Sequence, residues 1–120
     1  MAFILLADDD KEVQELVNVV LSVEGHTLMI AGDGREALSL MEEHDFDLLI
    51  LDYLMPRMSG IEAYKEAKAR DPQLPPALML TVQREIKTIE ECLKAGVKDY
   101  VIKPFKMADL AQRVGKLLKS

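Results

Sequence analysis

The sequence predicts an α/β fold, a doubly wound sheet of five parallel strands covered by helices. Two observations predict it. Five short apolar runs recur along the 120 residues and are nearly continuous rather than alternating, which is typical of strands buried on both faces. Between these runs the apolar residues have helical spacing, so strand and helix alternate five times in the pattern (βα)5. The length suits one core, and we expect residues 1–120 to form one domain.

The predicted elements follow in order along the chain. Strands are expected at residues 3–7, 28–31, 48–51, 77–80 and 100–102. The first helix has apolar residues at positions i, i+3, i+4, i+7 and i+8, and the other helices have shorter stripes. In chain order the stripes are Val13, Leu16, Val17, Val20 and Leu21; Ala37, Leu38 and Met41; Ile61, Ala63, Tyr64 and Ala67; Ile86, Ile89 and Leu93; and Leu110, Val114, Leu117 and Leu118. The Ala95-Gly96 pair marks the expected end of the fourth helix.

The net charge is −6 and is unevenly distributed. Residues 1–52 hold 13 acidic and two basic side chains, whereas residues 53–120 hold eight acidic and 13 basic ones. The acidic excess argues against nucleic acid as a direct ligand, because phosphate binding requires a concentrated basic face. We expect no membrane span and no signal peptide, since the apolar runs are short and no basic residue precedes the first. Cys92 is the only cysteine, which excludes an intrachain disulfide and favours a cytoplasmic setting.

Polar residues follow four of the five predicted strands. They are, in chain order, Asp8, Asp9, Asp10, Asp52, Thr81 and Lys103. In such sheets ligands bind beyond the carboxyl ends of the strands, near the point where the strand order reverses. If the order is 2-1-3-4-5, the four strands that carry these residues are contiguous. Several carboxylates, a hydroxyl and an amine would then meet at one edge of the sheet.

Each of these residues also has an ordinary explanation. Asp10 is favoured as the cap of the first helix. A single aspartate after a strand is most often a turn residue, a single threonine is a strand end, and the pair Lys103-Pro104 is typical of an exposed loop. Taken together, these explanations require four coincidences at one edge of one sheet. We therefore interpret the set as a site.

Electrostatics indicates what the site would hold. Two carboxylates about 5 Å apart repel each other by roughly 3 kcal/mol at an effective dielectric constant near 20. Repulsion thus makes it unfavourable to hold the carboxylates of Asp8, Asp9 and Asp52 together unless a cation lies among them. Lys103 offsets only one of the three negative charges. An all-oxygen site that stays partly open suits Mg²⁺, which keeps water ligands and accepts a phosphate oxygen. Asp52 could then attack phosphorus while the metal, Lys103 and Thr81 hold the phosphoryl oxygens.

Four segments carry a resemblance to a known family: ILLADDD at 4–10, DLLILDYLMPRMSG at 47–60, LT at 80–81 and AGVKDYVIKPF at 95–105. In order and spacing they resemble the receiver domain of two-component response regulators, and the resemblance spans essentially the whole chain. It implies a flavodoxin-like sheet. It also implies that the protein is not an enzyme acting on another substrate but a phosphoacceptor that catalyses its own phosphorylation and dephosphorylation.

The resemblance assigns roles to individual residues. It implies that Asp52 accepts a phosphoryl group from a histidine kinase or phosphotransfer protein. Asp8 and Asp9 would serve Mg²⁺, Asp9 as a direct ligand, and the backbone carbonyl of Leu54 would complete the protein ligands. Thr81 and Lys103 would contact the phosphoryl group, Tyr100 would be the switch aromatic, and the Lys103–Pro104 bond would be cis. The reader of the signal would be an output protein or a fused effector domain.

Three positions bear on how fast the phosphate enters and leaves. Val82 follows the switch threonine where the family usually has a small residue, and it could narrow access for phosphodonors. The family's phosphate lifetime is tuned two residues after the acceptor and two after the switch threonine, here Leu54 and Gln83. Leu54 cannot position an attacking water and Gln83 could do so only weakly. We therefore expect slow self-hydrolysis.

The expected output surface comprises the fourth helix, fifth strand and fifth helix. There Asp99, Asp109 and Arg113 partly match the charged set of dimerising transcriptional regulators. Ile89 and Cys92 stand where that group usually has basic residues, so we expect a monomer or a weak dimer built on apolar contacts.

The sequence leaves other classes less well supported. A pseudo-receiver would use the same fold only for docking, but all the acceptor-site residues are present. Phosphatases of the haloacid dehalogenase type need a second aspartate where this chain has Leu54, and an FMN protein needs a Ser/Thr/Gly-rich loop where this chain has three acids. His26 and His44 have no partner at ligand spacing and are expected on the surface.

Overall fold

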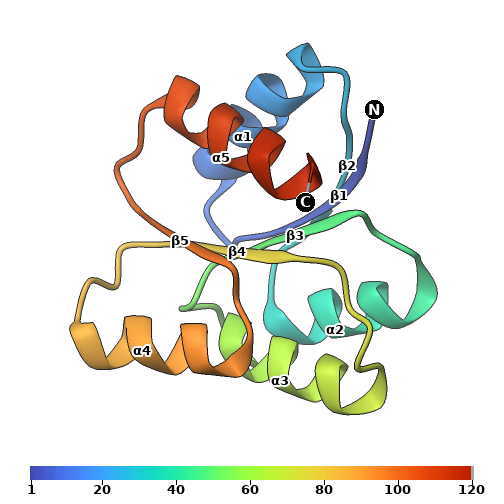
Figure 1. Cartoon of the computed structure of the whole chain (residues 1–120), viewed down its shortest axis with the longest axis vertical. Helices are drawn as coiled ribbons and strands as arrows, with labels where there is room; N and C mark the ends of the chain where they lie inside the picture. Colours follow the sequence, from blue (N-terminus) through green and yellow to red (C-terminus); the bar gives the residue numbers. More distant parts are fainter. Residues whose placement is uncertain (120) are drawn as a thin grey trace.

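Five parallel strands form one sheet in the order β2-β1-β3-β4-β5 in the computed structural model, which describes residues 1–119 (Figure 1). The strands are β1 (Phe3–Ala7), β2 (Thr27–Ala31), β3 (Leu48–Leu51), β4 (Ala77–Thr81) and β5 (Asp99–Ile102). The helices are α1 (Lys11–Val23), α2 (Gly34–Glu43), α3 (Gly60–Arg70), α4 (Ile86–Ala95) and α5 (Met107–Lys119). The predicted fold class and strand order are confirmed, and three strands each extend one residue beyond the predicted range.

The helices form two layers, with α1 and α5 on one face of the sheet and α2, α3 and α4 on the other (Figure 1). Because successive side chains of a strand point to opposite faces, each strand contributes to two cores. In β1, Leu5 and Ala7 pack in the core beneath α2, α3 and α4, whereas Ile4 and Leu6 pack in the core beneath α1 and α5. This double burial explains why the strands are continuous apolar runs in the sequence.

Three helices begin at a side-chain cap. Asp10 caps α1 by accepting a hydrogen bond from the backbone N–H of Glu12, which confirms the cap predicted for this residue. Asp33 caps α2, and Ser59 caps α3 in a capping box with Glu62. The longest helices, α1 and α5, have 13 residues each, and none in the described part of the chain is long and apolar enough to cross a membrane.

The buried face of α4 differs from the predicted stripe. Ile86 is 75% exposed and Leu93 is 48% exposed, whereas Cys92 is fully buried. The helix lies on the β4–β5 side of the sheet (Figure 1), and Cys92 is its buried residue among those described. Its inward face is centred on Cys92, so the apolar side chains of Ile86 and Leu93 point away from the core.

The loop between β3 and α3 packs closely against the start of α2. A Cβ atom on Gly34, the first residue of α2, would overlap the backbone carbonyl of Met58. Beside this contact, Arg57 has a left-handed backbone (φ 68°) and its guanidinium lies 3.0 Å from Asp33. The absence of a side chain at residue 34 therefore allows the loop after β3 to lie close to the start of α2.

We expect Gly34→Ala to destabilise the fold and Gly115→Ala to stabilise it. At position 34 the methyl group must displace backbone, which we expect to cost about 1–3 kcal/mol. At position 115, inside α5, an added Cβ meets nothing within 4 Å. Alanine should stabilise that helix by up to about 1 kcal/mol. Urea denaturation of both variants measures this, and equal effects of the two substitutions would contradict the close approach at Gly34.

Candidate functional site

Three of the predicted residues are held at the carboxyl edge of the sheet because the strand ladder continues one residue beyond the strands. The Asp8 N–H donates to the Ala31 carbonyl at 3.0 Å, and the Asp52 N–H donates to the Ala7 carbonyl at 2.9 Å. On the other side, the Lys103 N–H donates to the carbonyl of Thr81 at 2.9 Å. Asp8 and Asp52 therefore follow neighbouring strands, β1 and β3, where the strand order reverses. In sheets of this type, that reversal is where ligands bind.

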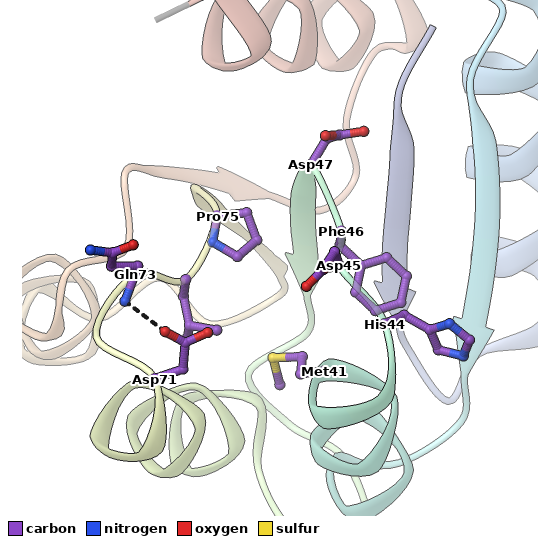
Figure 2. Close-up of a pocket in the computed structure, with 9 residues that line it drawn as sticks. Met41, His44, Asp45, Phe46, Asp47, Asp71, Gln73 and Pro75 are labelled. Atoms are coloured by element: carbon purple, nitrogen blue, oxygen red, sulfur yellow. Dashed lines mark hydrogen bonds between the residues drawn. The ribbon is translucent and has the colours of Figure 1, made fainter.

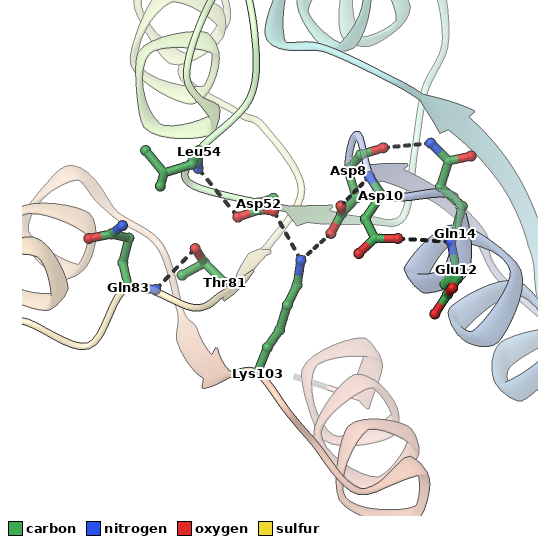
Figure 3. Close-up of polar contacts among 9 residues, drawn as sticks. All are labelled: Asp8, Asp10, Glu12, Gln14, Asp52, Leu54, Thr81, Gln83 and Lys103. Carbon is green, nitrogen blue, oxygen red and sulfur yellow. Dashed lines mark hydrogen bonds and ion pairs between the residues drawn. The ribbon is translucent and has the colours of Figure 1, made fainter.

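The side chain of Lys103 joins the two carboxylates. Its Nζ lies 2.7 Å from Oδ2 of Asp8 and 3.0 Å from Oδ2 of Asp52 (Figure 3). Asp8 is 1% exposed and Asp52 7% exposed, so both charges are largely withdrawn from water. Lys103 reaches them from the segment after β5, where its peptide bond to Pro104 is cis, as predicted. One ammonium group thus neutralises part of a buried negative cluster.

Burial and pairing shift the pKa values of Asp8 and Lys103. Burial raises the pKa of the Asp8 carboxyl, and the hydrogen bonds from Lys103 and from the Asp10 N–H offset this only in part. The nearby charge of Asp52 acts in the same direction as burial. For Lys103, burial alone would lower the pKa, but the hydrogen bonds to Asp8 and Asp52 outweigh it and the pKa is raised. The lysine is therefore held as a cation between two carboxylates.

Two further contacts fix Asp8. Its Oδ1 accepts a hydrogen bond from the backbone N–H of Asp10 at 2.9 Å. The side-chain amide of Gln14, on α1, donates to the backbone carbonyl of Asp8 at 2.6 Å (Figure 3). Gln14 gives no signal in the sequence, because a single glutamine in a helix carries no distinctive pattern. Asp8 is thus held through its carboxylate and its main chain.

Asp9 completes a group of carboxylates that could hold a metal ion. One oxygen from each of Asp8, Asp9 and Asp52 lies within 4.8 Å of the others. Asp9 is exposed, whereas the other two are buried, so the group opens to solvent on one side. An open set of oxygen donors fits Mg²⁺, which retains several water ligands. Nitrogen or sulfur ligands, which zinc prefers, are absent from this group.

Thr81 and Tyr100 are connected through the main chain of Gln83. The buried hydroxyl of Thr81 accepts from the Gln83 N–H at 3.4 Å, and the Tyr100 hydroxyl donates to the Gln83 carbonyl at 2.7 Å. The sequence indicates a role only for the Gln83 side chain. The Gln83 main chain links the two predicted switch residues, and no sequence pattern indicates a main-chain contact of this kind.

Two exposed apolar residues follow site residues in the chain, Leu54 two positions after Asp52 and Val82 directly after Thr81. Leu54 is 50% exposed and Val82 is 57% exposed. The Leu54 N–H donates to Oδ1 of Asp52 at 3.3 Å, so its main chain lies against the carboxylate (Figure 3). Neither side chain can donate or accept a hydrogen bond.

A separate hollow of about 330 Å³ lies at the opposite edge of the sheet, before β3 (Figure 2). Its acidic residues are dispersed: Asp47 accepts from the Phe3 N–H, and Asp71 accepts from the Gln73 N–H. His44, expected on the surface, is half-buried because its ring packs beside Phe3 and Phe46. His26 is also half-buried, since its Nδ1 accepts from the Ala2 N–H. The hollow has none of the residues that the sequence assigned to a site.

We expect Lys103→Met, measured with EDTA present, to lower the free energy of unfolding by about 3 kcal/mol near neutral pH, because two buried carboxylates lose their shared cation. The deficit should shrink as the pH falls from about 7 to about 4. Without the ammonium, the already raised pKa of Asp8 rises further, so the folded state takes up a proton before the unfolded chain does.

The exposed neighbour Lys106 provides the matched control. Lys106→Met should change stability by less than about 0.5 kcal/mol at every pH. A pH-independent deficit in Lys103→Met would contradict the coupling of this lysine to the carboxylates.

Comparison with known proteins places this geometry in a family. Residues 4–115 match the family model of the response regulator receiver domain. The chain is 37% identical over 116 residues to the response regulator MprA of Mycolicibacterium vanbaalenii and, over the same length, 37% identical to the transcriptional regulatory protein CpxR of Klebsiella pneumoniae. These alignments cover 97% of this chain, 50% of MprA and 49% of CpxR. The chain therefore spans about half the length of these relatives.

Solved structures agree with the sequence relatives. The receiver domain of the Francisella response regulator 1452 superposes with a TM-score of 0.92 at 31% identity, covering 99% of this chain and 98% of that one. A CheY-like receiver domain protein from Methanospirillum hungatei gives a TM-score of 0.93 at 28% identity, covering 99% and 94%. Fold, strand order and sequence agree, and the chain belongs to the family of receiver domains of two-component response regulators.

Proposed function

We propose that residues 1–120 act as a single phosphoacceptor domain, in which Asp52 takes a phosphoryl group from a histidine kinase or a phosphotransfer protein. The observation that supports this most directly is the buried pair Asp8 and Asp52 bridged by Lys103, with the exposed Asp9 beside it. A site built only for docking has no need of a buried cation and three converging carboxylates. That argues against the pseudo-receiver alternative.

The proposed reaction transfers the phosphoryl group from nitrogen to oxygen. An Asp52 carboxylate oxygen attacks phosphorus, the bond between phosphorus and the donor imidazole nitrogen breaks, and its electron pair stays on the imidazole. We propose that the Lys103 ammonium and the Thr81 hydroxyl contact the phosphoryl oxygens. In this proposal the domain catalyses its own phosphorylation and the later hydrolysis of the acyl phosphate.

Mg²⁺ is the cofactor that the donor set fits. We propose that Asp9 and Asp52 bind it directly with the backbone carbonyl of Leu54, while Asp8 supports the site from its buried position. When bound, the ion supplies positive charge that offsets repulsion between the carboxylates and the incoming phosphoryl group.

The output follows from the contacts of Thr81 and Tyr100. We propose that phosphorylation draws Thr81 toward the phosphoryl oxygen and that Tyr100 turns further inward. Their shared link to the Gln83 backbone supports this coupling. The change would shift the populations of two forms of the surface made by α4, β5 and α5, which an output protein or a fused effector domain reads.

That surface supports a monomer or a weak dimer. Arg113 pairs within its own chain, with Asp99 at 2.7 Å and with Asp109 at 3.1 Å. The charged groups that could bridge two copies are therefore already satisfied internally. We further propose a cytoplasmic domain that binds neither nucleic acid nor membrane directly.

Incubation with phosphoramidate and Mg²⁺ should add one phosphoryl group to the wild-type protein, measured by intact mass. Asp52→Asn should gain none, because the nucleophilic carboxylate is gone. Asp9→Asn should lose most of the reaction, whereas Asp10→Asn should react as wild type does, since asparagine still caps α1. Wild-type protein that gains no mass, or an Asp52→Asn variant that gains it equally, would contradict the proposal.

The acyl phosphate should decay slowly, and Leu54→Asn should shorten its half-life by about tenfold, which corresponds to one hydrogen bond that orients the attacking water. Leu93→Asn is the matched control: Leu93 is 48% exposed on α4 and Leu54 is 50% exposed beside the acceptor. The half-lives are measured by loss of the phosphorylated mass after the donor is removed. Faster decay in the wild-type protein than in Leu54→Asn would show that the leucine does not protect the phosphate.

A further inference from the structure

Tyr53, the residue directly after the acceptor, is tied to α4 by its side chain. Its hydroxyl donates to Oε1 of Glu91 at 2.8 Å. The other carboxylate oxygen of Glu91 lies 3.1 Å from Nζ of Lys65 on α3. The three side chains thus form a bridge from the acceptor loop to the middle of α4, with a branch to α3.

The bridge is held in one protonation state near neutral pH. The hydrogen bond from Tyr53 and then that from Lys65 lower the pKa of Glu91, so this group is a carboxylate. The Tyr53 hydroxyl is the donor to this carboxylate, at 2.8 Å.

The acceptor side of the bridge is firmly placed. Asp52 is held by Lys103, and the Tyr53 carbonyl accepts from the Gly60 N–H at 3.0 Å. A Cβ atom on Gly60 would overlap the backbone carbonyl of Asp52, so the acceptor segment and the start of α3 are in close contact. Asp52 and Tyr53 thus both contact Gly60, so a displacement of Asp52 would also move Tyr53.

The α4 side is held by few groups. The helix begins at Glu85 without a side-chain cap, and Cys92 is its only fully buried residue among those described. Tyr53 and Tyr100 both pack against the core cluster that contains Cys92. A helix with so few anchors is one whose position a single hydrogen bond can bias.

We propose that Tyr53 and Glu91 couple the acceptor site to α4 by a route separate from that of Thr81 and Tyr100. The inference rests on the proposed function, since the event transmitted is phosphorylation of Asp52. Tyr53 acts as a positioning residue: it moves with the acceptor loop and displaces Glu91 and hence α4. Because coupling between two sites is reciprocal, a partner that binds α4 would change the affinity of the acceptor site.

The test uses beryllofluoride with Mg²⁺ as a stand-in for the phosphoryl group, followed by NMR. In the wild-type protein its binding should shift the amide signals of residues 88–94 and the ring signals of Tyr100. Tyr53→Phe removes only the hydroxyl, and Glu91→Ala removes the acceptor. In both variants the α4 shifts should lose most of their amplitude while the Tyr100 ring still responds, and beryllofluoride affinity should weaken about fivefold, as for one hydrogen bond.

Tyr64→Phe is the matched control, because Tyr64 is buried on α3 and its hydroxyl lies 3.4 Å from Nζ of Lys68 rather than at the acceptor loop. It should leave the α4 response and the affinity as in wild type. An α4 response in Tyr53→Phe and Glu91→Ala equal to that of wild type would overturn the inference while leaving the acceptor assignment standing. Failure of beryllofluoride to bind the wild-type protein would instead overturn the proposed function.

Discussion

The ammonium group of Lys103 between Asp8 and Asp52 is the interaction on which the site depends. Two carboxylates this buried would otherwise repel each other and favour protonation. The lysine offsets part of this negative charge, and one oxygen each from Asp8, Asp9 and Asp52 lies within 4.8 Å of the others, an arrangement that could hold a metal ion. Lys103 also follows β5, the strand farthest in sequence from Asp8, so the site forms only when β1, β3 and β5 lie in one sheet.

Much of this could be predicted from the sequence, because burial on both faces leaves a simple pattern. The continuous apolar runs predicted the strands, and the polar residues after them predicted the site. What could not be predicted are contacts that depend on how one helix is rotated or where one loop lies. The stripe of Ile86, Ile89 and Leu93 predicted the buried face of α4 only in part: Ile89 is half-buried, but Ile86 and Leu93 are exposed. Spacing alone does not tell which side of a helix is covered. Gln14 and Glu91 gave no signal because their partners are set by tertiary placement.

The helix α4 stands out as the least anchored element near the site. It has no side-chain cap, and its apolar residues Ile86 and Leu93 face outward. Gln83, whose main chain contacts Thr81 and Tyr100, lies three residues before its start, and Glu91, which accepts from Tyr53, lies at its middle. A helix with few buried side chains can change position at small energetic cost, and these two contacts are where the acceptor site could act on it. The deeply packed strands cannot do this, because close-packed interiors resist small displacements.

The ladder hydrogen bonds at Asp8, Asp52 and Lys103 have a consequence for mutational tolerance. They set the spacing of the site through the backbone, which is independent of the identity of the side chains packed below. Substitutions of similar volume in either core would then reduce stability before they alter the spacing of the carboxylates. The core residues of such a domain can therefore vary widely while the site keeps its geometry, provided that the few residues beyond the strand ends are kept.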